Sequence, residues 1–264
     1  MREKKEKEIY EPVQGLLGDA VDYHVYEMRP QDRIIAAALG FAVSVVVVYV
    51  FFRSILFGVL GGVLLLVPAQ RLYRDYKIQK RGRTLLLQFK DLLESLAASY
   101  SAGQNTMGAF REAKGDMVSV YGEDADIAAE VELILEGMNN NLQVEELLFN
   151  FAARSGLSDV ESFANVFEVA NRQGSNLKQI IADSREIIND KIEIEMEIET
   201  MLQANKNELN VMILMPLVIV PMLGGLGAST IAANTPVNVG IKLVCIAIFA
   251  GAYLAGRKLT DITI

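Results

Sequence analysis

The residues that could carry out chemistry are few in this chain of 264 residues. It contains one histidine, His24, and one cysteine, Cys245. A single cysteine excludes an intramolecular disulfide and any multi-cysteine metal site, and one histidine cannot serve a histidine-based metal motif. The sequence also lacks a glycine-rich phosphate-binding loop and a glycine-rich dinucleotide turn. We therefore predict a protein that is not an enzyme and that needs no cofactor.

The densest group of possible metal ligands is an alternating run of glutamates. Carboxylate oxygens of this kind can bind divalent cations. On a helix they would point toward several faces, so we interpret them as a solvated acidic surface rather than a metal site. Their alternation with apolar residues is also typical of a half-buried strand, but we predict a helix, because no turn residue bounds the run and nothing nearby could pair with a lone strand. The glutamates are Glu193, Glu195, Glu197 and Glu199.

Apolar residues make up 52% of the chain, yet 22% of its residues are charged. The apolar residues concentrate in four runs, each roughly long enough to cross the ~30 Å hydrocarbon core of a bilayer. Arg53 separates the first two runs and the polar residues 234–236 separate the last two, so we expect two transmembrane hairpins. The runs cover residues 34–52, 54–70, 210–230 and 237–256.

Basic residues beside the runs predict their orientation, because cytoplasmic flanks carry the excess of Lys and Arg. The expected outer turns offer only Arg53 and Lys242, whereas six basic residues follow the second run directly. We expect a multi-pass protein of the cell membrane, with both termini and the region between the hairpins in the cytoplasm. The six residues that set this topology are Arg71, Arg74, Lys77, Lys80, Arg81 and Arg83.

The segment between the hairpins is acidic. From Thr84 to Leu209 it has nine Lys or Arg against twenty-three Asp or Glu, a balance of −14. Such a field repels the phosphates of nucleic acids and of anionic lipids. A protein partner with a basic surface is its natural complement.

Apolar residues at 3,4 spacing predict a series of helices in this segment. We expect glycines or asparagines to end most of them, and Asp124 or Asp126 to cap the third. Ser158 and Glu161 have the spacing of a capping box. The expected stripes are 86–100 ending at Gly103, 106–113 ending at Gly115, 127–138 ending at 139–141, 144–151 ending at Gly156, 160–170 ending at Gly174, and a long helix from Leu177 that continues into the third apolar run.

These patterns predict an all-α fold, in which four transmembrane helices in two hairpins flank an antiparallel cytoplasmic helix bundle. The bundle is large enough to have its own core. The expected parts are a cytoplasmic N-terminal segment (1–33), the first hairpin (34–70), a basic linker (71–83), the cytoplasmic domain (84–209), the second hairpin (210–256) and a cytoplasmic tail (257–264).

Two stretches resemble the type II secretion F domain family. The first is LLLQFKDLLESLAASYSAGQNTMGAF (85–110), and the second runs from GLSDVESF through the RQGSNL step at 172–177 to INDKI at 188–192. Together with DYHVYEM before the first apolar run, the resemblance covers roughly residues 20–230. The residues that carry the motif, which we expect to have mainly structural roles, are Phe89, Gly103, Phe110, Gly156, Phe163 and Gly174.

The resemblance implies a membrane platform of a type II secretion or Tad-type pilus machine, which links a cytoplasmic secretion ATPase to pilin helices extracted from the membrane. Longer relatives carry two copies of the cytoplasmic domain, and the single copy here resembles the Tad-type members. Because one four-span unit offers little intramembrane surface for a central pilin, we expect a second copy or a paralogue to complete the platform. A transporter is disfavoured, since Lys242 is the only ionisable group inside an apolar run and lies near its outer end. A membrane-anchored signalling or adaptor protein would share this topology and is the alternative.

Overall fold

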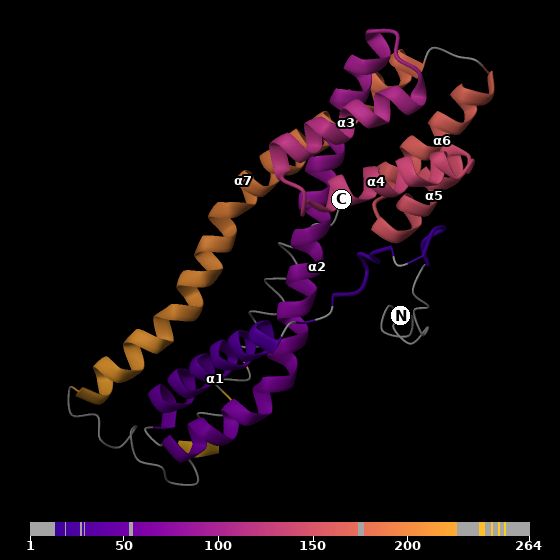
Figure 1. Ribbon diagram of the computed structural model, residues 1–264. Coiled ribbons are helices and arrows are strands. Elements are labelled where there is room, and N and C mark those ends of the chain that lie inside the picture. The colour runs from indigo at the N-terminus through magenta and orange to yellow at the C-terminus, as the bar shows by residue number, and fades with distance from the viewer. Residues whose placement is uncertain are drawn as a thin grey trace. The chain divides into compact units, whose positions relative to one another are not determined.

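The computed structural model describes residues 14–18, 20–26, 28, 30–52, 55–173, 177–225, 238–240, 244, 248 and 251. Within these residues the structure is built from seven helices and has no strand, apart from an isolated bridge between Gly15 and Gly18. The predicted all-α class is therefore confirmed (Figure 1). The helices are α1 (Pro30–Phe52), α2 (Ile55–Ser101), α3 (Thr106–Tyr121), α4 (Asp126–Asn139), α5 (Val144–Ser155), α6 (Ser158–Gln173) and α7 (Leu177–Gly225).

The chain forms two compact units. The first, which we call the bundle, consists of Met1–Glu27 and Asp75–Ile192. The second, the apolar unit, consists of Met28–Arg74 and Glu193–Ile264. Helices α2 and α7 contribute to both units. The bundle thus differs from the expected 84–209 domain, because it takes in the N-terminal segment and ends earlier along α7.

Phenylalanines form the centre of the bundle. Phe89 of α2 packs edge to face against Phe163 of α6 and Phe151 of α5, with ring centroids 5.6 and 6.0 Å apart. Phe163 also lies 5.6 Å from Phe167, one turn further along α6. All four rings are buried. Each buried ring contributes about 1.5–3 kcal/mol through the removal of apolar surface from water, and edge-to-face pairs add about 0.5–1.5 kcal/mol.

Most helix ends agree with the sequence, but two differ. Helix α3 continues through Gly115 to Tyr121 and ends at Gly122, where φ is +88°. A glycine inside a helix costs only about 1 kcal/mol, and the burial of Met117 beyond it offsets that cost. At α4 the N-cap is Ala125, whose side chain cannot form a cap bond, and Asp126 lies in the first turn, where its carboxylate accepts from Arg81.

The capping-box prediction at α6 is wrong in its register. The carbonyl oxygen of Leu157 accepts hydrogen bonds from the amides of Val160 and Glu161, so Leu157 occupies the cap position and Ser158 lies in the first turn. Helix α7 confirms the predicted long final helix, which includes residues 192–199 of the alternating run. It also continues through Pro216 in the third apolar run.

In the apolar unit, α1 is long and apolar enough to cross a membrane. Its stretch Pro30–Val50 has a mean hydropathy of 2.3 and is 11% buried, and Asn210–Val220 of α7 is a shorter apolar stretch. Among the described residues, α1 is thus the one candidate membrane span. Helix α1 ends at Phe52 and α2 begins at Ile55, while Arg53, most side chains of 54–70, Gly174 and most of 237–256 lie outside the described residues.

Candidate functional site

Residues 20–26, which we call the strap, run over α4 and α5 of the bundle, with a turn at Tyr23 and His24. The amide of Tyr23 donates a hydrogen bond to the carbonyl oxygen of Arg154 at 3.0 Å. Just before the strap, the side-chain amide of Asn150 donates to the carbonyl oxygen of Gln14 at 3.0 Å. The second half of α5 therefore holds the N-terminal chain by that chain's backbone groups, which bond regardless of the side chains that they carry.

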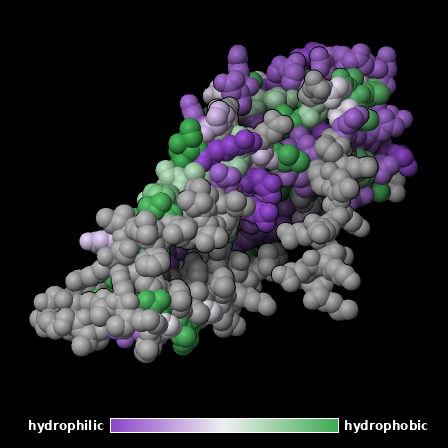
Figure 2. All heavy atoms as spheres, turned by 90° about the horizontal axis from the view of Figure 1, so that it is seen from below, coloured by the Kyte–Doolittle hydropathy of each residue, from purple (hydrophilic) through white to green (hydrophobic). Residues whose placement is uncertain are grey.

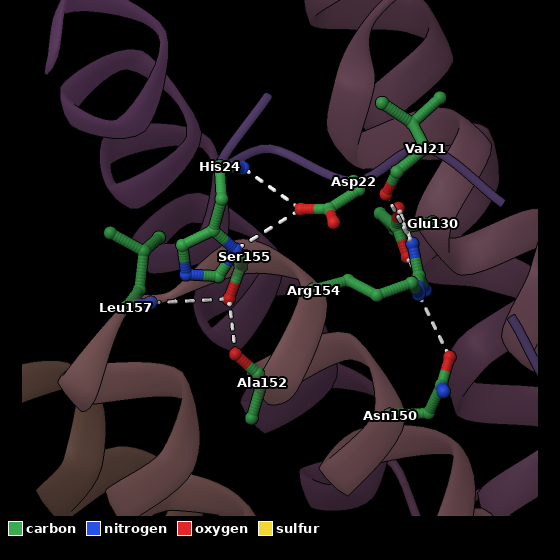
Figure 3. A network of polar contacts seen from close by, with 9 residues as sticks. All are labelled: Val21, Asp22, His24, Glu130, Asn150, Ala152, Arg154, Ser155 and Leu157. Atoms are coloured by element: carbon green, nitrogen blue, oxygen red, sulfur yellow. Dashed lines mark hydrogen bonds and ion pairs between the residues drawn. The ribbon is translucent and has the colours of Figure 1, made fainter. Parts of the chain in front are cut away.

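A buried ion pair lies beneath the strap (Figure 3). The guanidinium of Arg154, on α5, donates two hydrogen bonds to the carboxylate of Glu130, on α4, at 2.6 and 2.5 Å. It also donates to the carbonyl oxygen of Val21 at 3.0 Å and to Oδ1 of Asn150 at 2.8 Å. The side chains of Arg154 and Glu130 are 3% and 1% exposed. Buried charges of this kind are tolerated only when they are paired and hydrogen-bonded, and both conditions are met here.

Tyr23 completes the network from the strap. Its hydroxyl donates to Oε1 of Glu130 at 2.9 Å, and the guanidinium of Arg81 lies 4.7 Å from the centre of its ring. Burial of the phenol, together with the negative charges of Glu130 and Asp126, raises the pKa of Tyr23. Tyr23 therefore stays protonated at any physiological pH and acts as a permanent donor.

Arg81 connects this network to α2. Its Nε and Nη2 donate to the two carboxylate oxygens of Asp126 at 2.8 and 2.5 Å. The hydrogen bond to Asp126 raises the pKa of Arg81. A planar guanidinium that pairs with a carboxylate in this two-pronged way while it covers an aromatic ring is a contact that lysine cannot reproduce.

His24 lies at the edge of the strap, next to the glycine that ends α5. Its amide donates to Oδ1 of Asp22 at 2.9 Å, and its Nδ1 lies 3.1 Å from the same oxygen. Gly156 has φ of +66°, and a Cβ built there would lie 2.3 Å from Nε2 of His24. The position thus requires glycine both for its left-handed backbone and for the approach of the imidazole.

The network is chemically closed. Glu130 and Arg154 bind each other, and they form further hydrogen bonds with Tyr23, Val21 and Asn150. Among the described residues, no group of three or more His, Cys, Asp or Glu side chains could hold a metal ion. What this arrangement does is fasten the chain that leads into α1 onto the bundle.

The motif residues predicted from the sequence lie mostly in the core. Phe89, Phe110 and Phe163 are each no more than 2% exposed. Gly103, with φ of +81°, lies in the turn between α2 and α3, and Gly156 ends α5. Gly174 lies outside the described residues. Phe89 and Phe163 are in direct contact, whereas the glycines stand at separate helix ends rather than in one site.

The six basic residues all lie on α2, so residues 71–83 are helical where a linker was expected. Arg81 pairs with Asp126 and covers the ring of Tyr23. Lys77, like Arg81, is half-buried. Arg71, Arg74, Lys80 and Arg83 are exposed.

Sequence reasoning missed the buried pair, although a signal for it existed. Glu130 falls between Ile127, Val131 and Ile134 on the stripe that α4 buries, and Arg154 follows Phe151 on the buried stripe of α5. Opposite charges on the buried faces of two neighbouring helices indicate a pair, since an unpaired charge there would be costly.

A second feature of the bundle is a groove of about 510 Å³ between α3 and α4. Gly115, Ala128 and Ala129 leave it open, and Lys114 of α3 bonds Glu132 of α4 across it. Basic and acidic side chains both line the groove, and the visible face of the bundle is largely hydrophilic with apolar residues scattered over it (Figure 2). Such a surface suits a polar protein contact better than a small apolar ligand.

No family model, no curated protein and no solved structure matches this chain.

Proposed function

We propose that this chain is a non-enzymatic membrane platform protein of a type II secretion or Tad-type pilus assembly machine. It would couple a cytoplasmic secretion ATPase to the extraction and assembly of pilins. The observation that carries the proposal is the contact between Phe89 and Phe163, at 5.6 Å between ring centroids. These rings come from the two stretches that resemble the type II secretion F domain family, and their packing supports a single copy of such a domain.

The proposed topology has four transmembrane helices and a cytoplasmic bundle. It is supported by the length and hydropathy of α1, by the apolar stretch Asn210–Val220 of α7, and by the four apolar runs of the sequence. The basic residues at the start of α1 and along α2 favour a cytoplasmic bundle. The protein would therefore be a multi-pass protein of the cell membrane with both termini in the cytoplasm.

The bundle is the proposed docking surface for the ATPase. The excess of acidic residues between Thr84 and Leu209 gives it a field that attracts a basic protein surface and repels nucleic acid. Exposed acidic residues lie on two sides, with Glu123, Asp124 and Glu136 around α3 and α4, and Glu161, Asp183 and Glu186 on α6 and α7.

The apolar unit would hold or guide pilin transmembrane helices. One four-span chain offers little intramembrane surface for a central pilin, so a second copy or a paralogue would complete the platform. Exposed apolar side chains on α1 and α7, among them Val46, Val211 and Val218, are available for such contacts. Helix association in lipid relies on packing of this kind.

Co-purification of the membrane-extracted full chain with a candidate secretion ATPase tests the docking proposal. We expect association that weakens as salt is raised, because screening shortens the reach of the acidic field. Charge reversal to lysine at Glu123, Asp124 and Glu136, or at Glu161, Asp183 and Glu186, should weaken it when the interface lies on that side. The control substitutions Ser119→Asn and Ser162→Asn leave the charge unchanged and should not weaken the association. Binding that ignores salt and both reversals, or a chain that captures sensor proteins instead, would favour the adaptor alternative.

A further inference from the structure

The start of α1 and the middle of α2 meet within the apolar unit. The hydroxyl of Tyr73, on α2, lies 3.4 Å from Oδ1 of Asp32, in the first turn of α1. The first apolar run begins two residues after Asp32, and the second ends three residues before Tyr73. The contact therefore aligns the start of one apolar run with the end of the other, as an antiparallel hairpin requires.

Three exposed arginines lie within two residues of this contact along the chain. Arg33 follows Asp32 in the first turn of α1, and Arg71 and Arg74 stand three residues apart on α2, so they lie on one face of that helix. Leu72, between them, is 58% exposed. Apolar side chains, a tyrosine and guanidinium groups thus occur together at the level where the apolar runs stop.

This combination fits the boundary between hydrocarbon and headgroups in a bilayer. Tyrosine is enriched at that depth, because its ring is apolar and its hydroxyl is polar. Guanidinium groups bind phosphate through paired hydrogen bonds, which an ammonium group cannot do. With Asp32 and Asp75 counted, the three arginines leave a local charge of +1, so a lipid with a net negative headgroup is favoured over a zwitterionic one.

We propose that Arg33, Arg71 and Arg74 form a binding site for the headgroups of anionic phospholipids. The site depends on the insertion of α1 and the first part of α2 into a membrane, which belongs to the proposed function, but it does not depend on an ATPase or a pilin. Each arginine near an anionic surface strengthens binding roughly fivefold, so loss of all three should weaken it by well over tenfold.

The test uses the full chain in nanodiscs made from phosphatidylglycerol and phosphatidylcholine. Mass spectrometry of the ejected protein measures which lipids stay bound. We expect phosphatidylglycerol to be enriched on the wild type and not on the variant Arg33→Gln/Arg71→Gln/Arg74→Gln. The matched control Arg111→Gln/Arg172→Gln/Lys178→Gln removes three exposed charges from the bundle and should keep the enrichment. Equal enrichment in all three proteins would overturn the proposal.

Replacement of the three arginines by lysine provides a second variant with unchanged charge. It should insert normally and bind phosphatidylglycerol with intermediate strength, because point charges remain while paired hydrogen bonds are lost. A photoreactive residue at position 72 identifies the occupant in cells. A lipid adduct supports the proposal, and an adduct with an acidic protein segment overturns it. The salt-dependent ATPase association of the same preparations separates a failure here from a failure of the platform proposal.

Discussion

At the scale of single residues, the pair of Glu130 and Arg154 decides how the N-terminal strap is held. Burial removes both charges from water, which costs free energy. Their mutual attraction offsets this desolvation cost only because Tyr23, Val21 and Asn150 form hydrogen bonds with the remaining polar atoms of the pair. A buried pair of this kind contributes little net stability compared with apolar residues of the same volume. Removal of one partner alone is a different case, since it leaves an unpaired charge in the interior.

Glu130→Gln should therefore lower the free energy of unfolding of the bundle by about 3–5 kcal/mol. The double change Glu130→Leu/Arg154→Met should cost much less than either single change, because no charge stays buried. Urea denaturation of the detergent-solubilised chain, followed by circular dichroism, measures both. Glu132→Gln is the matched control two residues along α4, where the side chain is 48% exposed and bonded to Lys114, and it should cost less than about 1 kcal/mol. Equal losses at positions 130 and 132 would contradict this account.

Two tyrosines should make the bundle sensitive to alkaline pH. The hydrogen bond from Tyr121 to Asp91 raises the pKa of that phenol to about 12, and burial raises the pKa of Tyr23. A pKa that is higher in the folded state means that the protonated form is favoured by folding. This stability is fully present below about pH 10, the pKa of an unfolded tyrosine, and is lost as pH rises above it.

We expect Tyr121→Phe to lower stability at pH 8 by about 1 kcal/mol, the worth of one hydrogen bond. It should also flatten the loss of stability between pH 10 and pH 12, an interval set by the raised pKa of Tyr121. Denaturation at several alkaline pH values, combined with the absorbance of ionised phenol, tests this. An unchanged slope between wild type and variant would show that Tyr121 is not responsible.

At the scale of elements, the sequence predicts helices well and their ends less well. Periodicity identifies each buried stripe, and Gly156 ends α5 as expected. The continuation of α3 past Gly115 could not be predicted from the sequence. A glycine ends a helix only when the residues after it gain no stabilising contacts by remaining helical. Helical residues 192–199 show the reverse case, in which context outweighs a strand-like alternation. The buried pair escaped prediction, since the partner of Glu130 depends on tertiary packing.

Glycines at two helical positions should respond in opposite directions to alanine. A Cβ at Gly137 of α4 would lie 2.3 Å from Cδ2 of Leu147 on α5, whereas nothing lies within 4 Å of one at Gly115 of α3. Gly137→Ala should destabilise the bundle by about 1–3 kcal/mol through overpacking of buried Leu147. Gly115→Ala should stabilise it by about 0.5–1 kcal/mol, because alanine loses less backbone entropy. Thermal unfolding of both variants is decisive, and a shift of the same sign in each would refute the close packing of α4 on α5.

At the scale of the whole molecule, the chain divides into a polar bundle with an aromatic core and a unit rich in apolar helix. The distribution of apolar and charged residues along the sequence predicts this division, but it does not predict the residues at which the units begin and end. The bundle begins at Asp75 within the basic stretch of α2 and recruits Tyr23 from the N-terminal segment. Local periodicity cannot reveal the contact of Tyr23 with Glu130, because these residues are 107 positions apart in the sequence.

The proposed topology predicts which parts of the chain can be reached by reagents from outside the cell. A cysteine introduced at Gly103, in the turn after α2, should react with a membrane-impermeant maleimide only after cells are opened, once Cys245 has been changed to serine. Carbonate washing should leave the full chain in the membrane pellet, because apolar helices resist extraction at high pH. Labelling at position 103 in intact cells, or release by carbonate, would reject the proposed topology.

The strap is synthesised long before the residues that hold it. Val21 leaves the ribosome 133 residues before Arg154, which binds its carbonyl oxygen, and Tyr23 precedes Glu130 by 107. At about 5–20 residues per second, the nascent strap waits on the order of ten seconds for its partners. The first apolar helix follows it out of the tunnel long before α5 exists. The segment that precedes α1 therefore stays unfastened until α5 has been synthesised.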